Sequence, residues 1–169
     1  MKYRIDGTLI KDDFEVGDKI FAKLCNYLDQ KEMEYTIHDA EEGLNVLTAS
    51  LKGNDLPMDI ILAVNACDNL FIFTSLLPVE FGKEKLREAA MAICMINKYL
   101  NNGHFDLNVD TGEISFKMCN RWADSNVDDD IFSYFIQMGC GAVDLFNDKL
   151  LLLSKGMISL EDLHQFIHK

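Results

Sequence analysis

The sequence lacks the features that mark a membrane-spanning or secreted protein. It has no apolar stretch of about 18 residues, the length that a membrane-spanning helix needs, and no signal peptide at its start, MKYRIDG. Its five cysteines are odd in number and contain no CxxC pair. Each cysteine falls in a predicted helix, strand or hairpin, as a small buried apolar side chain would. We therefore expect a cytoplasmic protein with reduced thiols.

Basic residues are also scarce. The chain has 16 lysines and arginines against 28 acidic residues, which gives a net charge of −12. Such a charge repels phosphate backbones and anionic membranes, so we expect neither nucleic acid nor membrane as a partner. It favours basic or amphipathic polypeptide partners, although solubility alone would also explain an acidic surface.

The length of 169 residues and the 49% hydrophobic content are typical of one globular domain. We predict a single α+β domain over residues 1–169, an antiparallel β-sheet with helices packed on it, in the order helix, strands, helix, hairpin, helices. Residues 1–11 are expected to be a leader strand or a tail. Within them, Tyr3–Ile10 holds an Asp-Gly turn and could form a hairpin or stay unpaired. Residues 157–169 are expected to hold a short C-terminal helix.

The stretch from Lys83 to Cys119 organises the chain. It begins with a helix in which Ala89–Ile96 contains no polar residue. A helix that is apolar all round is covered on both sides, here by a sheet and by another helix or a second subunit. Asn101-Asn102-Gly103 is expected to end this helix in a left-handed conformation. A hairpin with strands over 105–109 and 114–118 follows, with Asp110 bonding its own turn and Gly112 at positive φ.

The remaining elements are read from hydrophobic periodicity and end signals. A helix is predicted over Asp13–Gln30. Four strands, over 33–38, 44–51, 58–64 and 70–77, predict an antiparallel meander whose last strand is central or covered on both faces, and which Pro78 and Gly82 end. A long helix is predicted next, capped by Ser125 or Asn126, with Asp128–Asp130 at its positive end and Lys155-Gly156 at its C-terminus. A final helix is predicted from Ser159, with Asp162 as its capping-box partner.

Candidate metal and catalytic groups are few. His164 and His168 stand at i, i+4 beside Glu161, a spacing that can hold a divalent metal, but no fourth ligand is visible. The cluster His38–Glu42 is expected to be exposed turn charge, since buried carboxylates need partners that this loop does not supply. We predict no catalytic residue, no metal site and no cofactor, and hence no enzyme.

A pair of glycines lies inside the long helix. Gly139-Cys140-Gly141-Ala142 lacks the preceding strand and the Lys-Ser/Thr ending of a phosphate loop. Two helical glycines cost about 1 kcal/mol each relative to alanine, so either a second helix approaches closely here or the helix bends. The predicted dimer or partner interface consists of Met91, Met95, Gly139, Gly141, Ala142 and Phe146.

Over roughly residues 15–155 the chain resembles the YbjN-like family of bacterial proteins, named for sensory-transduction regulation and grouped with the type III secretion chaperone-like fold. The residues that carry the resemblance are Leu76–Val79 (LLPV), Asn97-x-x-Leu100-x-x-Gly103-x-Phe105-x-Leu107 and Gly112-Glu113-Ile114-x-Phe116, with the long final helix after them. Secretion chaperones of this fold are small, acidic and homodimeric, and they hold a partner polypeptide in extended form. The resemblance offers no catalytic residues to carry over.

These observations together predict a non-enzymatic protein-binding module, chaperone- or adaptor-like, that acts as a homodimer on an unidentified protein or peptide partner. Two alternatives stay open. One is a regulatory protein that senses a small ligand, and the other is an enzyme whose site only the fold assembles.

Overall fold

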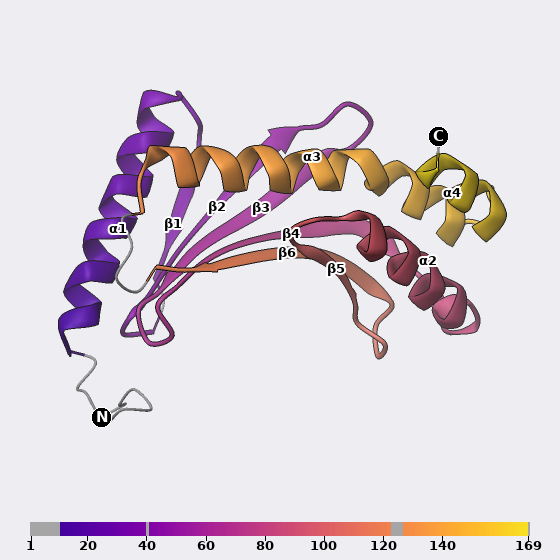
Figure 1. The fold of residues 1–169 in the computed structure, drawn as a ribbon, viewed down its shortest axis with the longest axis horizontal. Coiled ribbons are helices and arrows are strands. Elements are labelled where there is room, and N and C mark those ends of the chain that lie inside the picture. Colours follow the sequence, from indigo (N-terminus) through magenta and orange to yellow (C-terminus); the bar gives the residue numbers. More distant parts are fainter. Residues whose placement is uncertain (1–10, 40, 123–126, 169) are drawn as a thin grey trace. The chain divides into compact units, whose positions relative to one another are not determined.

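The computed structural model describes residues 11–39, 41–122 and 127–168. Within these residues the chain has an α+β fold with a six-stranded antiparallel sheet and four α-helices, as predicted (Figure 1). In chain order the elements are α1 (Lys11–Gln30), β1 (Thr36–His38), β2 (Leu44–Lys52), β3 (Pro57–Asn65), β4 (Leu70–Glu80), the 3₁₀ turn η1 (Lys83–Lys85), α2 (Leu86–Tyr99), β5 (His104–Leu107), β6 (Glu113–Arg121), α3 (Asp129–Ser154) and α4 (Leu160–Ile167). None of the helices in this described part is both long and apolar enough to cross a membrane.

The strand order in the sheet is β1-β2-β3-β4-β6-β5. The first four strands are neighbours in chain order, which confirms the predicted meander, and β4 lies in the interior of the sheet as its apolar run indicated. The β5–β6 hairpin joins the sheet through its second strand, so β5 lies at an edge (Figure 1). In this hairpin Phe105 stands opposite Phe116. The predicted leader hairpin at Tyr3–Ile10 lies outside the described residues.

The chain forms two compact units, and β2, β3, β4, β6 and α3 contribute residues to both. The first unit comprises the described parts of Met1–Ser50, Ile60–Phe73 and Cys119–Gln137. The second comprises Leu51–Asp59, Thr74–Met118 and Met138–Lys169 as far as they are described. The expectation of a single domain over residues 1–169 stays a prediction.

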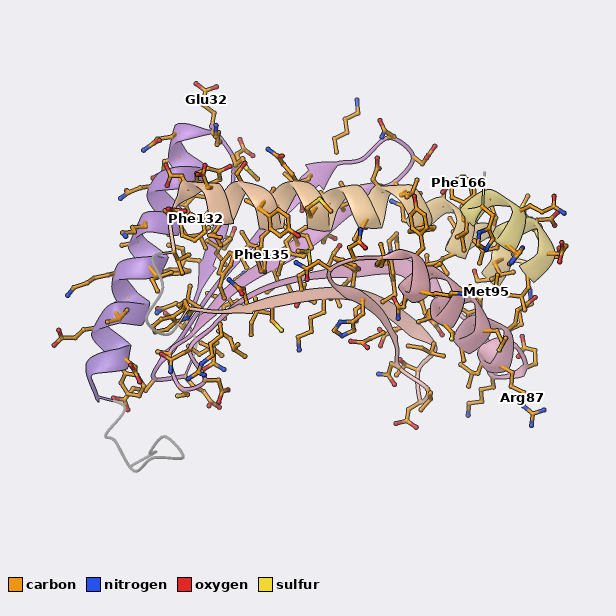
Figure 2. The ribbon with its side chains drawn as sticks, viewed as in Figure 1. Glu32, Arg87, Met95, Phe132, Phe135 and Phe166 are labelled. Carbon is orange, nitrogen blue, oxygen red and sulfur yellow. The ribbon has the colours of Figure 1, made fainter. Side chains whose placement is uncertain are left out.

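An aromatic cluster forms the core of the first unit. Phe71 of β4 contacts the rings of Phe132 and Phe135, with ring centroids 5.4 and 5.0 Å apart. Tyr27 of α1 contacts Phe132 at 5.8 Å. Phe132 and Phe135 lie on the first turns of α3 (Figure 2). Three separate elements therefore meet at one set of rings, which are nearly or fully excluded from water.

The second unit has its own aromatic core, centred on Phe146 of α3, which is 1% exposed. Its ring contacts Phe105 of β5 at 6.0 Å, Tyr99 of α2 at 6.2 Å and Phe166 of α4 at 6.1 Å. Phe105 in turn contacts Phe116 at 4.9 Å. One side chain thus ties the edge of the hairpin and two helices together.

Two strand boundaries differ from the prediction. β1 begins at Thr36 rather than at residue 33, because the residues after Gln30 form the turn that closes α1: Glu32 takes a positive φ of 55°, and the Met33 N–H bonds the Leu28 carbonyl at 3.0 Å. β4 continues through Pro78 to Glu80. Proline removes one donor from the sheet, but its φ is compatible with an extended strand, so it does not force the strand to end.

The ends of α2 and of the hairpin turn also differ in detail. α2 ends at Tyr99 because the next residue, Leu100, has an extended backbone. Gly103 has a positive φ of 76°, but it lies directly before β5 and does not end the helix. Gly112 has the predicted positive φ of 83°. The turn is bonded by Asn108, whose side-chain oxygen accepts from the N–H of Asp110 at 3.0 Å; Asp110 itself was the predicted acceptor. β5 ends at Leu107, so Val109 is exposed rather than part of the strand.

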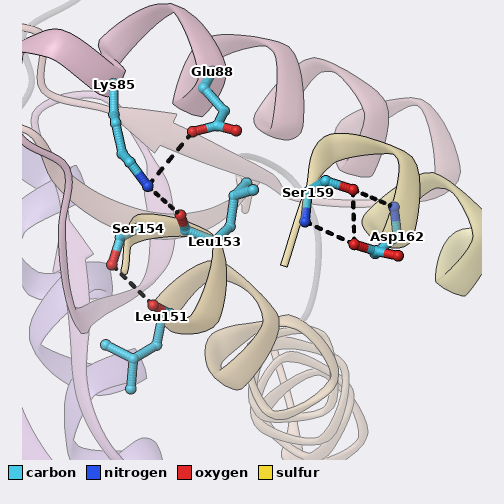
Figure 3. Close-up of polar contacts among 7 residues, drawn as sticks. All are labelled: Lys85, Glu88, Leu151, Leu153, Ser154, Ser159 and Asp162. Carbon is cyan, nitrogen blue, oxygen red and sulfur yellow. Dashed lines mark hydrogen bonds and ion pairs between the residues drawn. The ribbon is translucent and has the colours of Figure 1, made fainter. Parts of the chain in front are cut away.

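The predicted C-terminal end signal of α3 is confirmed. Gly156 has a φ of 70°, and the N–H groups of Gly156 and Met157 bond the carbonyls of Leu153 and Leu152, both at 2.9 Å. Lys85 adds a third contact here, since its ammonium donates to the Leu153 carbonyl at 3.0 Å (Figure 3).

The N-termini of α3 and α4 were also predicted from the sequence. α4 begins with a full capping box between Ser159 and Asp162, drawn in Figure 3. For α3 the predicted caps Ser125 and Asn126 lie outside the described residues. Within the described part, Asp128 accepts from the N–H of Ile131 at 3.4 Å.

Candidate protein-interaction surfaces

The apolar run on α2 divides into a buried and an exposed face. The buried face consists of Ala89, Ala92, Ile93 and Ile96, which repeat at helical spacing. β5 and α4 both contact this helix. On the other face Met91 is 55% exposed and Cys94 is also exposed. α2 was predicted to be covered on both sides, but its second face is partly exposed to solvent in this chain.

A small groove lies between α2 and α4. Its lining consists of Met95, Lys98, Tyr99, His164, Ile167 and His168, and its volume is about 250 Å³. The two histidine rings lie on one face of α4 with their centroids 4.3 Å apart. Tyr99 is 55% exposed, and Met91 stands one helical turn before Met95. We call this site the α2–α4 groove.

α4 is held firmly beside this groove. Leu163 has no exposed surface, and Phe166 packs edge-on against Phe146. The ammonium of Lys149 lies 4.9 Å from the centre of the Phe166 ring, a cation–π distance. Met95 of α2 and Phe166 of α4 are labelled in Figure 2. The capping box fixes the start of the helix, so the groove is formed before any ligand arrives.

A second exposed apolar surface lies on the part of α3 that belongs to the second unit. Met138 is 45% exposed and Leu145 is 43% exposed, and Gly141 lies between them on the helix. A Cβ added at Gly141 would meet nothing within 4 Å. Another helix could therefore approach the backbone closely at this point. We call Met138, Gly141, Ala142 and Leu145 the α3 outer face.

The structure places two of the six predicted interface residues in the interior. Phe146 is the centre of the core described above, and Gly139 is buried. Both lie on the inward side of α3, where the apolar stripe predicted for this helix packs. Met91 and Gly141 are exposed, while Met95 and Ala142 are half-buried. The interface role of these four stays a prediction.

The edge of the sheet at β5 is closed by a side chain. The amide of Asn97 on α2 donates to the Phe105 carbonyl at 3.0 Å and accepts from the Phe105 N–H at 2.8 Å. It therefore takes both backbone groups that an added strand would need at this residue. β-Strand addition is therefore unfavourable at this position of the β5 edge.

The titratable clusters form no recognisable reaction centre. Among the described residues, no group of three or more His, Cys, Asp and Glu side chains is placed to hold a metal ion. His38 shares a 2.7 Å hydrogen bond with Thr48, and His104 lies 3.3 Å from a carboxylate oxygen of Asp106. The remaining two histidines line the groove. Acidic side chains instead line two open hollows, one at Glu80, Asp110 and Glu113, and one at Asp128–Asp130.

Two of the thiols are held in their neutral form by burial. Burial, followed by the charge of Asp144, raises the pKa of Cys140 to about 11. Burial also raises the pKa of Cys25, an effect that a hydrogen bond with Tyr35 partly opposes. Because the thiolate is the nucleophilic form, neither cysteine is activated for chemistry.

The sequence analysis missed three residues of the α2–α4 groove, namely Lys98, Tyr99 and Ile167. Their signal in the sequence was weak. The positions Met91, Met95 and Tyr99 are spaced by four residues on one helix face, which indicates a continuous surface. Nothing in the sequence indicated that this surface would meet α4.

Comparison with protein-family descriptions and with curated proteins finds no match to this chain. Solved structures that are similar to it include the following two. YbjN from E. coli has 15% sequence identity and a TM-score of 0.53, with 79% of this chain and 89% of that chain covered. A chain of the HopA1–SchA chaperone–effector complex has 9% identity and a TM-score of 0.54, with 80% and 97% covered. The fold is therefore YbjN-like and type III secretion chaperone-like, as the resemblance implied.

Proposed function

We propose that this chain is a non-enzymatic protein-binding module of the chaperone or adaptor type, and that it acts as a homodimer. The observation that carries the proposal is the α3 outer face. Two large apolar side chains there are more than 40% exposed, and they flank a glycine with open space above it. Apolar side chains grouped in this way on one face are typical of an interaction surface.

The similarity to a chain of a chaperone–effector complex supports the protein-binding part of the proposal. The glycine supports the homodimer. A twofold axis through the α3 outer face would bring two copies of Gly141 together, and each glycine would let the other helix approach closely.

The oligomeric state tests this proposal directly. Light scattering at micromolar concentration should give about 38 kDa, twice the 19.2 kDa mass of the chain. Gly141→Leu should convert the dimer to a monomer, because the new side chain would fill the space that the second helix needs. The variant should fold normally, since a Cβ at this position meets no atom within 4 Å and a helix prefers leucine to glycine.

Ala22→Leu is the matched control. Ala22 is an exposed helical position on α1, so an added leucine there should leave the dimer intact. A wild-type chain that scatters as a monomer at micromolar concentration would overturn the homodimer. A dimer that survives Gly141→Leu would move the contact away from the α3 outer face.

A further inference from the structure

The charge of the α2–α4 groove is opposite to that of the chain as a whole. Acidic residues outnumber basic ones by 28 to 16 in the sequence. The groove lining nevertheless contains Lys98, His164 and His168, and its six residues include no carboxylate. The other three, Met95, Tyr99 and Ile167, are apolar or aromatic. The groove is therefore an apolar hollow whose rim carries one lysine and two imidazole rings that can donate hydrogen bonds.

The size of the groove indicates what can enter it. Sites for free small molecules usually enclose about 300–1,000 Å³, whereas this groove encloses about 250 Å³. That volume is sufficient for one large apolar side chain. The unbranched thioethers of Met91 and Met95 can adapt to side chains of different shape, a property that recurs at peptide-binding surfaces.

We propose that the α2–α4 groove binds an acidic segment of a partner polypeptide, which inserts one large apolar side chain. The carboxylates of the segment would pair with Lys98 and accept hydrogen bonds from the two histidine rings, while the apolar side chain lies against Met95, Tyr99 and Ile167. This inference rests on the proposed protein-binding function and names the partner's chemistry and its site. Because α4 is already packed in place by Leu163 and Phe166, binding requires no ordering of the groove.

Selection from a random peptide library tests the proposal with the full chain as bait. Dodecapeptides displayed on phage would be selected on immobilised protein, and the enriched peptides would be synthesised with a fluorescent label. We expect enriched sequences to combine several acidic residues with one large apolar residue. Their affinity, measured by fluorescence anisotropy, should fall about five- to tenfold for Lys98→Glu, since a rim charge changes from attractive to repulsive.

Matched variants separate the local charge from the net charge. Lys117→Glu changes the net charge equally at an exposed position on β6, and it should leave the affinity nearly unchanged. The double variant His164→Ala with His168→Ala should weaken binding, whereas His104→Ala, an exposed histidine on β5, should not. Circular dichroism of each variant checks that the fold is retained.

The outcomes also distinguish this inference from the proposed function. Peptides that are basic, or that bind Lys98→Glu and Lys117→Glu equally well, would overturn the groove and leave a protein-binding module intact. A library that yields no enriched peptide would overturn the groove inference, while light scattering would still decide the proposed function.

Discussion

At the scale of single residues, Gly112 is the position with the least freedom. A Cβ there would lie 2.0 Å from the Phe81 carbonyl oxygen, and the residue has a φ of 83°. The N–H of Phe81 also donates to the Gly112 carbonyl at 2.9 Å, which ties the hairpin tip to the chain just after β4. Two independent features therefore require a glycine at this position, namely the positive φ and the close approach of the Phe81 carbonyl.

We predict that Gly112→Val lowers the free energy of unfolding by at least about 2 kcal/mol, because a β-branched residue is strained at positive φ and would also clash with the Phe81 carbonyl. Urea denaturation measures the change. Glu113→Gln is the control: it keeps an oxygen that can accept from the Thr111 hydroxyl, as Glu113 does at 2.7 Å, so it should be nearly silent. Small, equal effects of the two changes would contradict this account of the turn.

At the scale of elements, Asn97 connects α2 to β5 through two hydrogen bonds to Phe105. We predict that Asn97→Leu costs about 2–3 kcal/mol, since it leaves two partly buried backbone groups unpaired. The loss of stability in Asn97→Asp should be smaller than in Asn97→Leu. A carboxylate can still accept from the Phe105 N–H, but its second oxygen faces the Phe105 carbonyl and cannot donate to it.

Hydrogen exchange at the Phe105 amide gives a local readout that a general loss of stability would not single out. In Asn97→Leu, exchange at the Phe105 amide should accelerate by a larger factor than exchange at the amides of β3. Asn101→Asp, an exposed position just beyond α2, is the control and should change neither quantity. Unchanged exchange at Phe105 in Asn97→Leu would show that β6 alone holds the strand.

The start of α4 carries a pH-dependent bond. The Ser159 N–H donates to the Asp162 carboxylate at 2.8 Å, and this bond, with the one from the Ser159 hydroxyl, lowers the pKa of Asp162 from its ordinary value. A lowered pKa means that the contribution to stability is complete above the unfolded value and is lost as the pH falls through the folded value. We predict that the capping box persists through the range in which an ordinary aspartate becomes protonated and opens only at a lower pH.

An NMR titration of the Asp162 carboxyl carbon checks this prediction. Its midpoint should lie below that of the unfolded chain and move upward in Ser159→Ala, which removes the hydroxyl donor. A midpoint at or above that of the unfolded chain would contradict the hydrogen bonding of the box.

At the scale of the whole molecule, the net charge of −12 and the basic groove act over different distances. The Debye length is about 30 Å at 0.01 M ionic strength and about 8 Å at 0.15 M, so only the net charge is felt by a distant partner at low salt. Raising the ionic strength across this range should therefore speed the association of an acidic peptide, because long-range repulsion is screened. Its dissociation should also become faster, because the pairs at the groove rim weaken.

Stopped-flow fluorescence with a labelled acidic peptide measures both rates. Association that slows as salt is added would show that the groove attracts the acidic peptide more strongly over a distance than the net charge repels it, which would contradict this account of the two charges.

The parts of this structure that the sequence predicted depend on neighbouring residues. The hairpin turn at Gly112, the helix end at Gly156 and the capping box of Ser159 with Asp162 each depend on residues only a few positions apart. The residue types at these positions are therefore sufficient to predict a turn, a helix end and a helix start. The α2–α4 groove joins Met95 to Ile167, and no local pattern determines that contact. Phe146 was assigned to an interface for the same reason, since an apolar side chain on a helix does not reveal what it packs against.

The bond pair between Asn97 and Phe105 also has a consequence for the order in which the protein is made. Ribosomes add about 5–20 residues per second, so β6 is completed about one to three seconds after β5. During that interval the strand that will neighbour β5 does not yet exist, but α2 does. The Asn97 amide can therefore take up the Phe105 backbone first. The nascent strand has a hydrogen-bonding partner from within its own chain before it can pair with a neighbouring polypeptide.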